Sequence, residues 1–207
     1  MASRAFHRVS NNANIVPIIL AAGEVTHLGF PQPLAQFGKL TALEIALANC
    51  AGLRTPIVVL GHQAAAVRLA IPQGVRVVVN RQWRSGQLGS LLAGIRHVPH
   101  EASFMLYPVD YPLLTPAVIR RLVDGFRARL KQHMIAVPTF RRRQGHPVIF
   151  APEMRQELAV AQTAREIVGR EKRRVKLVAV GTPAIWQGFD TPAAYGWRLR
   201  EYGRRLR

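Results

Sequence analysis

IVPIILAAGEVTHLGFPQPL, residues 15–34, begins with an apolar run and continues into small residues and a glycine. Residues 15–20 have the pattern of a buried strand, which is typical of parallel sheets. Ala21, Ala22 and Gly23 leave the backbone N–H groups accessible to an anion, because no large side chain covers them. The stretch therefore predicts an α/β protein with a phosphate-binding loop after its first strand, although packing alone also produces such loops.

Strand-like and helix-like segments alternate along the rest of the chain. We expect strands at 15–20, 56–61, 75–80, 103–109, 134–138, 147–151 and 175–180. We expect helices at 41–52, from the second strand to about residue 70, at 89–98, at 115–130, after about residue 152, at 163–170 and at 193–203. This alternation indicates an α/β fold with a mostly parallel sheet covered on both faces.

The order of the segments also predicts where a ligand binds. On such sheets ligands lie at the carboxyl ends of the strands, near the switch point of the topology. Loops 21–40, 80–89, 109–114 and 187–192 should therefore line one cleft. Neither an internal repeat nor a low-complexity linker divides the chain, so we expect a flexible tail at 1–14 and a single domain at 15–203.

The net positive charge indicates which kinds of partner the protein could bind. The chain has 207 residues, a net charge of +18 and 29 basic residues, of which four are lysines. Such a charge favours anionic partners. The arginines are scattered, with runs that include 141–143, 173–174 and the C-terminus, and neither an RNA-binding aromatic motif nor a zinc-finger spacing accompanies them. A solvated arginine-rich surface is favoured over a nucleic-acid partner, which stays an alternative.

Cysteine usage and hydropathy indicate the compartment. Cys50 is the single cysteine, which excludes a disulfide framework within the chain and a cysteine-based metal site. No window approaches eighteen unbroken apolar residues, so we expect no membrane span. Both observations favour a cytoplasmic protein.

The aspartates are few, and two of them follow strand ends. The chain contains three, Asp110, Asp124 and Asp190. Asp124 lies on the solvent face of an expected helix. Asp110 and Asp190 should meet at the same edge of the sheet, where two carboxylates could hold Mg²⁺ against phosphates. The structural alternatives are a turn residue for Asp110 and a helix N-cap for Asp190.

Five segments together resemble one family. The first loop, LAAGEVTHLGFPQPL, is similar to the pattern LAAGxSxRMGxPKxL of the MobA-like nucleotidyltransferases of molybdenum-cofactor synthesis, particularly their cytidylyl-transferring branch. The other segments are NRQWRSGQLGSLLAGI (80–95), VDYPLL (109–114), RRRQGHPVIF (141–150) and FDTPAAY (189–195). The ordered set spans residues 15 to 195 and is far more specific than any one member.

The resemblance implies a Rossmann-like three-layer α/β/α domain that binds a nucleoside triphosphate and Mg²⁺. It would transfer NMP to the phosphate of a molybdopterin acceptor and release pyrophosphate, and LAAG favours CTP over GTP. The implied metal ligands are Asp110 and Asp190. The implied nucleotide-binding residues are Leu20, Ala21, Ala22, Gly23, Gly61, Gly86 and Ser90. The acceptor side would hold Arg143, Gly145 and His146.

The first loop departs from the family pattern at two catalytic positions. His27 stands in place of the arginine and Gln32 in place of the lysine. Loss of one well-placed donor can cost on the order of 10²–10³ in rate. Lys39, Arg84 and Arg143 are candidate substitutes. A second hypothesis is therefore a degenerate relative that binds nucleotide or cofactor and serves a molybdoenzyme or its chaperone as an accessory protein. A basic RNA-associated protein is the third.

Overall fold

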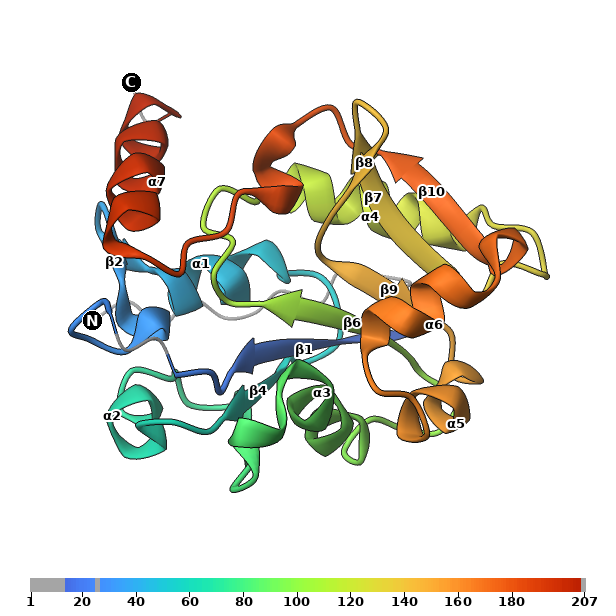
Figure 1. The fold of residues 1–207 in the computed structure, drawn as a ribbon, viewed down its shortest axis with the longest axis horizontal. Helices are drawn as coiled ribbons and strands as arrows, with labels where there is room; N and C mark the ends of the chain where they lie inside the picture. Colours follow the sequence, from blue (N-terminus) through green and yellow to red (C-terminus); the bar gives the residue numbers. More distant parts are fainter. Residues whose placement is uncertain (1–13, 25–26, 206–207) are drawn as a thin grey trace.

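An eight-stranded mixed sheet forms the centre of the computed structural model, which describes residues 14–24 and 27–205 (Figure 1). Its strand order is β10-β7-β9-β6-β1-β4-β5, with β8 paired to β7. The strands are β1 (Ile15–Ala21), β4 (Ile57–Leu60), β5 (Arg76–Val79), β6 (Ser103–Pro108), β7 (Ile135–Phe140), β8 (Arg143–Gln144), β9 (Val148–Phe150) and β10 (Val175–Ala179). A separate hairpin consists of β2 (Gln36–Phe37) and β3 (Leu40–Thr41).

Within the described residues, seven α-helices accompany the sheet. They are α1 (Ala42–Asn49), α2 (Ala64–Arg68), α3 (Gln87–Ile95), α4 (Pro116–Arg127), α5 (Met154–Ala159), α6 (Ala164–Arg170) and α7 (Pro192–Arg205). Short 3-10 turns lie at η1 (Gln32–Leu34), η2 (Trp83–Ser85), η3 (Lys172–Arg174) and η4 (Pro183–Trp186). None of the helices within 14–24 and 27–205 is long and apolar enough to cross a membrane.

Strand β1 lies between β6 and β4 in the sheet, and every one of its seven residues is buried. It pairs in parallel with β4 on one side and with β6 on the other. Strand β9 runs antiparallel to both β6 and β7, which makes the sheet mixed. The apolar run that opens the described chain therefore fixes the middle of the sheet, as its pattern predicts.

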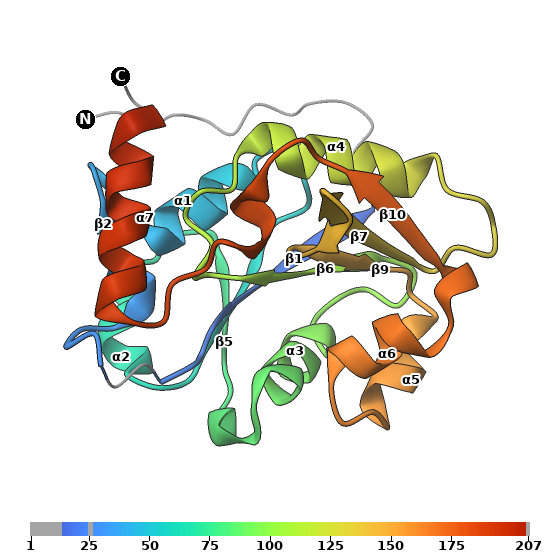
Figure 2. The same ribbon diagram turned by 45° about the horizontal axis from the view of Figure 1, so that its top comes forward.

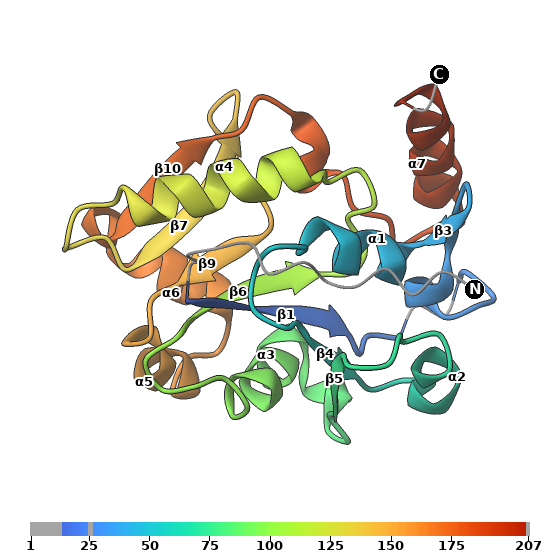
Figure 3. The same ribbon diagram turned by 180° about the vertical axis from the view of Figure 1, so that it is seen from behind.

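Helices cover both faces of the sheet. Helices α1 and α4 lie on one face, and α3, α5 and α6 lie on the other (Figure 2). The view from behind shows α4 crossing β7 and β10 (Figure 3). Alternate residues of β1 serve the two cores: Ile19 packs in the cluster that contains Leu43 and Leu122, and Ile18 packs in the cluster that contains Leu91 and Leu158. The three-layer α/β/α fold class is thereby confirmed.

The observed elements follow the expected ones closely, with two additions. The segment 141–146 was expected to be an exposed loop, but β8 pairs back onto β7 through a turn at Arg141 and Arg142, whose φ values are 47° and 65°. The β2–β3 hairpin was also missed. Both additions consist of two-residue strands, which are too short to show a period in the sequence. The tail expected at 1–14 lies outside the described residues except for Asn14.

Candidate active site

The four loops expected to meet do line one cleft, at the carboxyl ends of β1 and β6. The cleft has a volume of about 630 Å³, which is in the range of about 300–1,000 Å³ common for ligand pockets. Its lining residues are Leu20, Ala22, Gly23, Glu24, Gln32, Trp83, Arg84, Gly86, Gln87, Ser90, Pro108, Asp110 and Asp190. Eight of the predicted site residues are therefore together: Leu20, Ala22, Gly23, Gln32, Gly86, Ser90, Asp110 and Asp190.

The first loop presents its backbone to the cleft. Gly23 is exposed, and a Cβ atom built on it would have no neighbour within 4 Å. Space for a ligand therefore lies directly against this backbone. Ala21 differs from its neighbours, because its side chain is buried in the core on the α1 and α4 side and does not line the cleft.

Gly61 lies behind the cleft wall and is not among the lining residues. A Cβ atom on Gly61 would come within 2.5 Å of the Trp83 Cβ and 2.6 Å of the Ala22 carbonyl oxygen. This glycine therefore allows the end of β4 to pack directly against Trp83 and the first loop. Its structural role is packing, and its predicted contact with nucleotide stays a prediction.

The loop 80–89 is held in place by Asn80. The buried Asn80 side chain donates to the Ser90 hydroxyl at 3.2 Å and accepts from the Gln82 backbone N–H at 3.0 Å. Gly86, which has a φ of 95°, turns the chain into α3. Only glycine adopts this conformation readily, so the turn depends on it. The arrangement fixes Gly86 and Ser90 on the cleft wall.

Asp110 and Asp190 face the same cleft from two loops. The Phe189 backbone N–H donates to the backbone carbonyl of Asp110 at 3.1 Å, and this hydrogen bond joins the two loops. Burial and, to a smaller extent, the charge of Asp190 raise the pKa of the Asp110 carboxyl to about 7. Neither carboxylate forms an ion pair within the described residues. Two acids in this situation are stabilised by a shared cation.

The two carboxylates fit a divalent metal bound together with its ligand. Within the described residues, no group of three or more His, Cys, Asp and Glu side chains could hold a metal. Mg²⁺ commonly takes one or two carboxylates and completes its shell with water and substrate phosphates. The donor set therefore suits a metal that arrives with a nucleotide, rather than a permanent structural ion.

The structure shows whether each aspartate has the purely structural role that the sequence also allowed, which was a helix N-cap for Asp190, a solvent-facing helix position for Asp124 and a turn for Asp110. The first turn of α7 is capped by Thr191, whose hydroxyl accepts from the Ala194 N–H at 3.2 Å, so the Asp190 side chain is not the cap. Asp124 is exposed on α4 and lies 3.9 Å from Arg127. Asp110 is in a turn, as expected, and lines the cleft as well.

Gln32 belongs to the cleft, and His27 does not line it. The Gln32 side-chain amide donates to the Phe189 carbonyl, which ties the first loop to the loop that carries Asp190. His27 is exposed on a turn. The two replaced family positions therefore have different surroundings in this chain.

Arg84 is the only lysine, arginine or histidine among the described residues that line the cleft. Its guanidinium lies 4.2 Å from the centre of the Trp83 ring, an arrangement that orients the cation. Arg84 forms no ion pair with any described acid. Lys39 lies in the β2–β3 turn, outside the lining.

A second cavity of about 600 Å³ adjoins the cleft, and Gln87 lines both. Arg143, Gly145 and His146, the predicted acceptor-side residues, lie on its wall. The Arg143 guanidinium is 4.8 Å from the centre of the Trp186 ring. The His146 ring packs against Tyr111 at 5.2 Å. The cavity therefore combines cationic groups with aromatic surfaces.

His146 is half-buried, and its imidazole is uncharged at neutral pH. Burial lowers the pKa of its imidazole to about 4. Its Nδ1 is buried and has no hydrogen-bond partner among the described residues. Buried polar atoms are normally paired, so this nitrogen is an exception within the described part of the chain.

These features define a three-layer α/β protein with a cleft at the carboxyl edge of its sheet, where the glycine-containing first loop and an acidic pair meet. The family model of the MobA-like NTP transferase domain matches residues 17–176. The chain belongs to this family of nucleotidyltransferases.

Individual relatives and solved structures are similar to this chain to different degrees. Nicotine blue oxidoreductase of Paenarthrobacter nicotinovorans is 30% identical over 190 residues, covering 86% of this chain and 92% of the relative. Rv0371c of Mycobacterium tuberculosis H37Rv is 28% identical with a TM-score of 0.77, covering 90% of this chain and 98% of that one. It has also been solved as a manganese complex. A CMP:2-keto-3-deoxy-manno-octonic acid synthetase complexed with CTP shares the fold, with a TM-score of 0.70 at 14% identity over 92% of this chain and 99% of that one.

Sequence reasoning missed several cleft residues. Glu24 and Gln87 lack any local signal, because their neighbours in the cleft come from distant parts of the chain. Trp83 was noted only as part of a family segment. A signal for Trp83 was the small residue at Gly61, which leaves room for the indole.

Proposed function

We propose that this protein transfers CMP from CTP to the phosphate of a molybdopterin-type acceptor and releases pyrophosphate. The observation that carries the proposal is the junction at Gln87 between the acidic nucleotide cleft and the cationic, aromatic second cavity. Such a junction allows two phosphorylated ligands to meet. The LAAG form of the first loop supports CTP over GTP.

The residues of the cleft are suited to positioning and charge neutralisation, which dominate phosphoryl-type transfer. The backbone at Gly23 and Gly86 would bind phosphate oxygens, and Arg84 would neutralise part of their charge. Asp110 and Asp190 would hold a Mg²⁺ that balances the charge of the transferred group. An oxygen of the acceptor phosphate would then attack the α-phosphorus of CTP. The bond between the α-phosphorus and the oxygen that bridges to the β-phosphorus would break, and pyrophosphate would leave.

The second cavity is suited to a flat anionic acceptor. Trp186 and Tyr111 provide surfaces on which a pterin ring could pack, and Arg142, Arg143 and Arg165 provide cationic groups. The arginines favour a phosphate on the acceptor rather than a neutral alcohol.

The proposal is tested by pyrophosphate release. Purified protein with Mg²⁺ and molybdopterin is incubated with CTP, GTP, ATP or UTP in parallel. We expect pyrophosphate with CTP above all, and no release when either molybdopterin or Mg²⁺ is omitted. Failure of all four nucleotides would contradict the proposed transfer.

A second candidate is an accessory protein that binds nucleotide or cofactor without turnover. It is favoured by the charge of the cleft, where three acids, Glu24, Asp110 and Asp190, face one cation, Arg84. A relative that is 30% identical is named an oxidoreductase, so likeness to relatives alone does not support one reaction for this chain. This candidate predicts saturable CTP binding with no pyrophosphate release, and a molybdoenzyme or its chaperone as the partner.

The change Gln32→Lys should restore a cation to the cleft. A lysine ammonium in place of the amide could still donate to the Phe189 carbonyl while facing the nucleotide phosphates. We expect pyrophosphate release to rise about tenfold, the lower range of single-donor effects. The control is His27→Lys, since His27 does not line the cleft. Weaker CTP binding in Gln32→Lys would show that the cleft is built around the uncharged amide, and would support the accessory candidate.

The metal-free protein should become less stable as the pH rises through about 7. The pKa of Asp110 is raised from 3.8 to about 7 in the folded state. Folding therefore favours the protonated form, and this stabilisation is lost at higher pH. In EDTA we expect the free energy of unfolding, relative to Asp110→Asn, to fall by a few kcal/mol between about pH 4 and 7 and to change little above that. Denaturant titrations measure this, and Mg²⁺ with CTP should restore the stability of wild type at pH 8. An unchanged difference between the two proteins across this range would contradict the raised pKa.

A further inference from the structure

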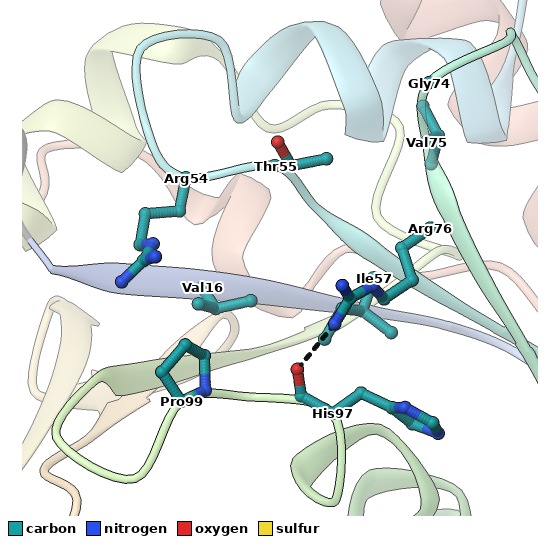
Figure 4. A pocket seen from close by; sticks show the side chains of 9 residues that line it. All are labelled: Val16, Arg54, Thr55, Ile57, Gly74, Val75, Arg76, His97 and Pro99. Carbon is teal, nitrogen blue, oxygen red and sulfur yellow. Dashed lines mark hydrogen bonds between the residues drawn. The ribbon is translucent and has the colours of Figure 1, made fainter.

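A separate cavity lies at the opposite end of the sheet from the cleft. It has a volume of about 560 Å³ and lies at the amino ends of β1, β4 and β5 (Figure 4). Its wall includes Arg54, Thr55, Arg76 and Pro99, and none of its lining residues is acidic. The nucleotide cleft shares no lining residue with this cavity.

The two arginines of this cavity are held in place. The Arg54 Nη1 donates to the Asn14 Oδ1 at 2.6 Å, and the Arg76 Nη1 donates to the His97 carbonyl at 2.9 Å. A guanidinium has five N–H donors, so each keeps further donors for a ligand. Neither arginine forms an ion pair with a described acid. Each is therefore both oriented and available.

The guanidinium groups lie on either side of Val16, as Figure 4 shows. Val16 and Ile57, which are buried, form an apolar floor beneath them. Both arginines are exposed, so their remaining N–H donors are accessible to a ligand. The combination of an oriented pair and an apolar floor is typical of a site for an anion that carries an apolar body.

We propose that this cavity binds a small phosphate ester. The two arginines would hold the dianionic phosphate from opposite sides, because a guanidinium matches phosphate geometry with two parallel hydrogen bonds. The apolar part of the ligand would lie on Val16 and against Pro99. The site is independent of the proposed nucleotide transfer, since its residues take no part in the cleft.

The test uses phenyl phosphate, inorganic phosphate and benzyl alcohol as probes, in titrations followed by amide NMR on the full chain. Phenyl phosphate should shift the amides of Val16, Val75 and Arg76 and bind more tightly than inorganic phosphate. Benzyl alcohol, which lacks the anion, should bind at least tenfold more weakly. Arg54→Gln and Arg76→Gln should each weaken phenyl phosphate binding about tenfold or more. The control Arg68→Gln, an exposed arginine on α2, should bind as wild type does.

Two outcomes would overturn the proposal. Shifts confined to Gly23 and Gly86 would assign the binding to the nucleotide cleft, and unchanged affinity in Arg54→Gln would exclude the arginine pair. Arg76→Gln also removes the hydrogen bond to the His97 carbonyl, so its melting temperature is measured alongside. Where that variant is destabilised, Arg54→Gln decides, because among the described residues the Arg54 side chain hydrogen-bonds only to Asn14.

Discussion

Asp110→Ala should reduce pyrophosphate release about 10³-fold or more and abolish the Mg²⁺ dependence of CTP binding. Metal stabilisation of transferring phosphates is worth several kcal/mol, and each 1.4 kcal/mol changes a rate about tenfold. Asp110 is the partly buried member of the acidic pair, so its loss leaves only the exposed Asp190 to hold the metal. Steady-state rates and calorimetric CTP titrations, with and without Mg²⁺, measure both effects.

Asp124→Ala is the matched control for this change. It removes an aspartate from the exposed face of α4, where the nearest cation is Arg127, and it does not alter the cleft. Rates and CTP affinity should equal those of wild type. Equal losses in the two variants would mean that Asp110 acts through general charge or stability, and the two-carboxylate metal site would then be abandoned.

Arg84→Gln should lower the rate of transfer by about 10²–10³, the size of effect seen when one preorganised donor to developing charge is removed. Arg84 is the one described cation in the cleft, and it is oriented on the Trp83 ring. Because the first-loop cations of the family pattern are absent, this guanidinium would meet the triphosphate alone. The loss should appear mainly in kcat, with a smaller rise in KM, since charge develops in the transition state.

Arg81→Gln separates this role from net charge. Arg81 is exposed in the same loop and does not line the cleft. Its loss changes the total charge equally and should change the rate by less than about twofold. Arg84→Lys should recover part of the rate, because it keeps the charge while losing the planar contact with Trp83. A wild-type rate in Arg84→Gln would show that the cleft works without a cation.

Much of the fold could be predicted because its signals are local. The apolar run of β1 and the alternation of strands and helices indicate one sheet between two layers of helices. The topology then brings four loops to one edge of that sheet. Helix α1 shows the same agreement at residue level, since Thr41 and Glu44 form a capping box. The hairpins at β2–β3 and β7–β8 escaped prediction because two-residue strands depend on their partners.

The candidate site could be predicted in part, because the strand ends placed the loops of Asp110 and Asp190 at one edge of the sheet and the family segments added further residues. The segments around Asp110 and Asp190 led to residues that share the cleft. The first-loop pattern implied a catalytic position for His27 and a nucleotide contact for Ala21, and neither residue lines the cleft. Which basic residue lines the cleft could not be predicted, because the three candidates Lys39, Arg84 and Arg143 come from three different loops. Their positions depend on packing around Trp83, Trp186 and the β2–β3 turn, and this packing has no local pattern.

The most direct test of the proposed transfer is mass spectrometry of the acceptor after reaction with CTP and Mg²⁺. We expect molybdopterin to gain the mass of one CMP residue, with one pyrophosphate released per product, and we expect neither product in Asp110→Ala. An unmodified acceptor, in a reaction where the protein demonstrably binds CTP, would contradict the transferase account and favour the accessory protein.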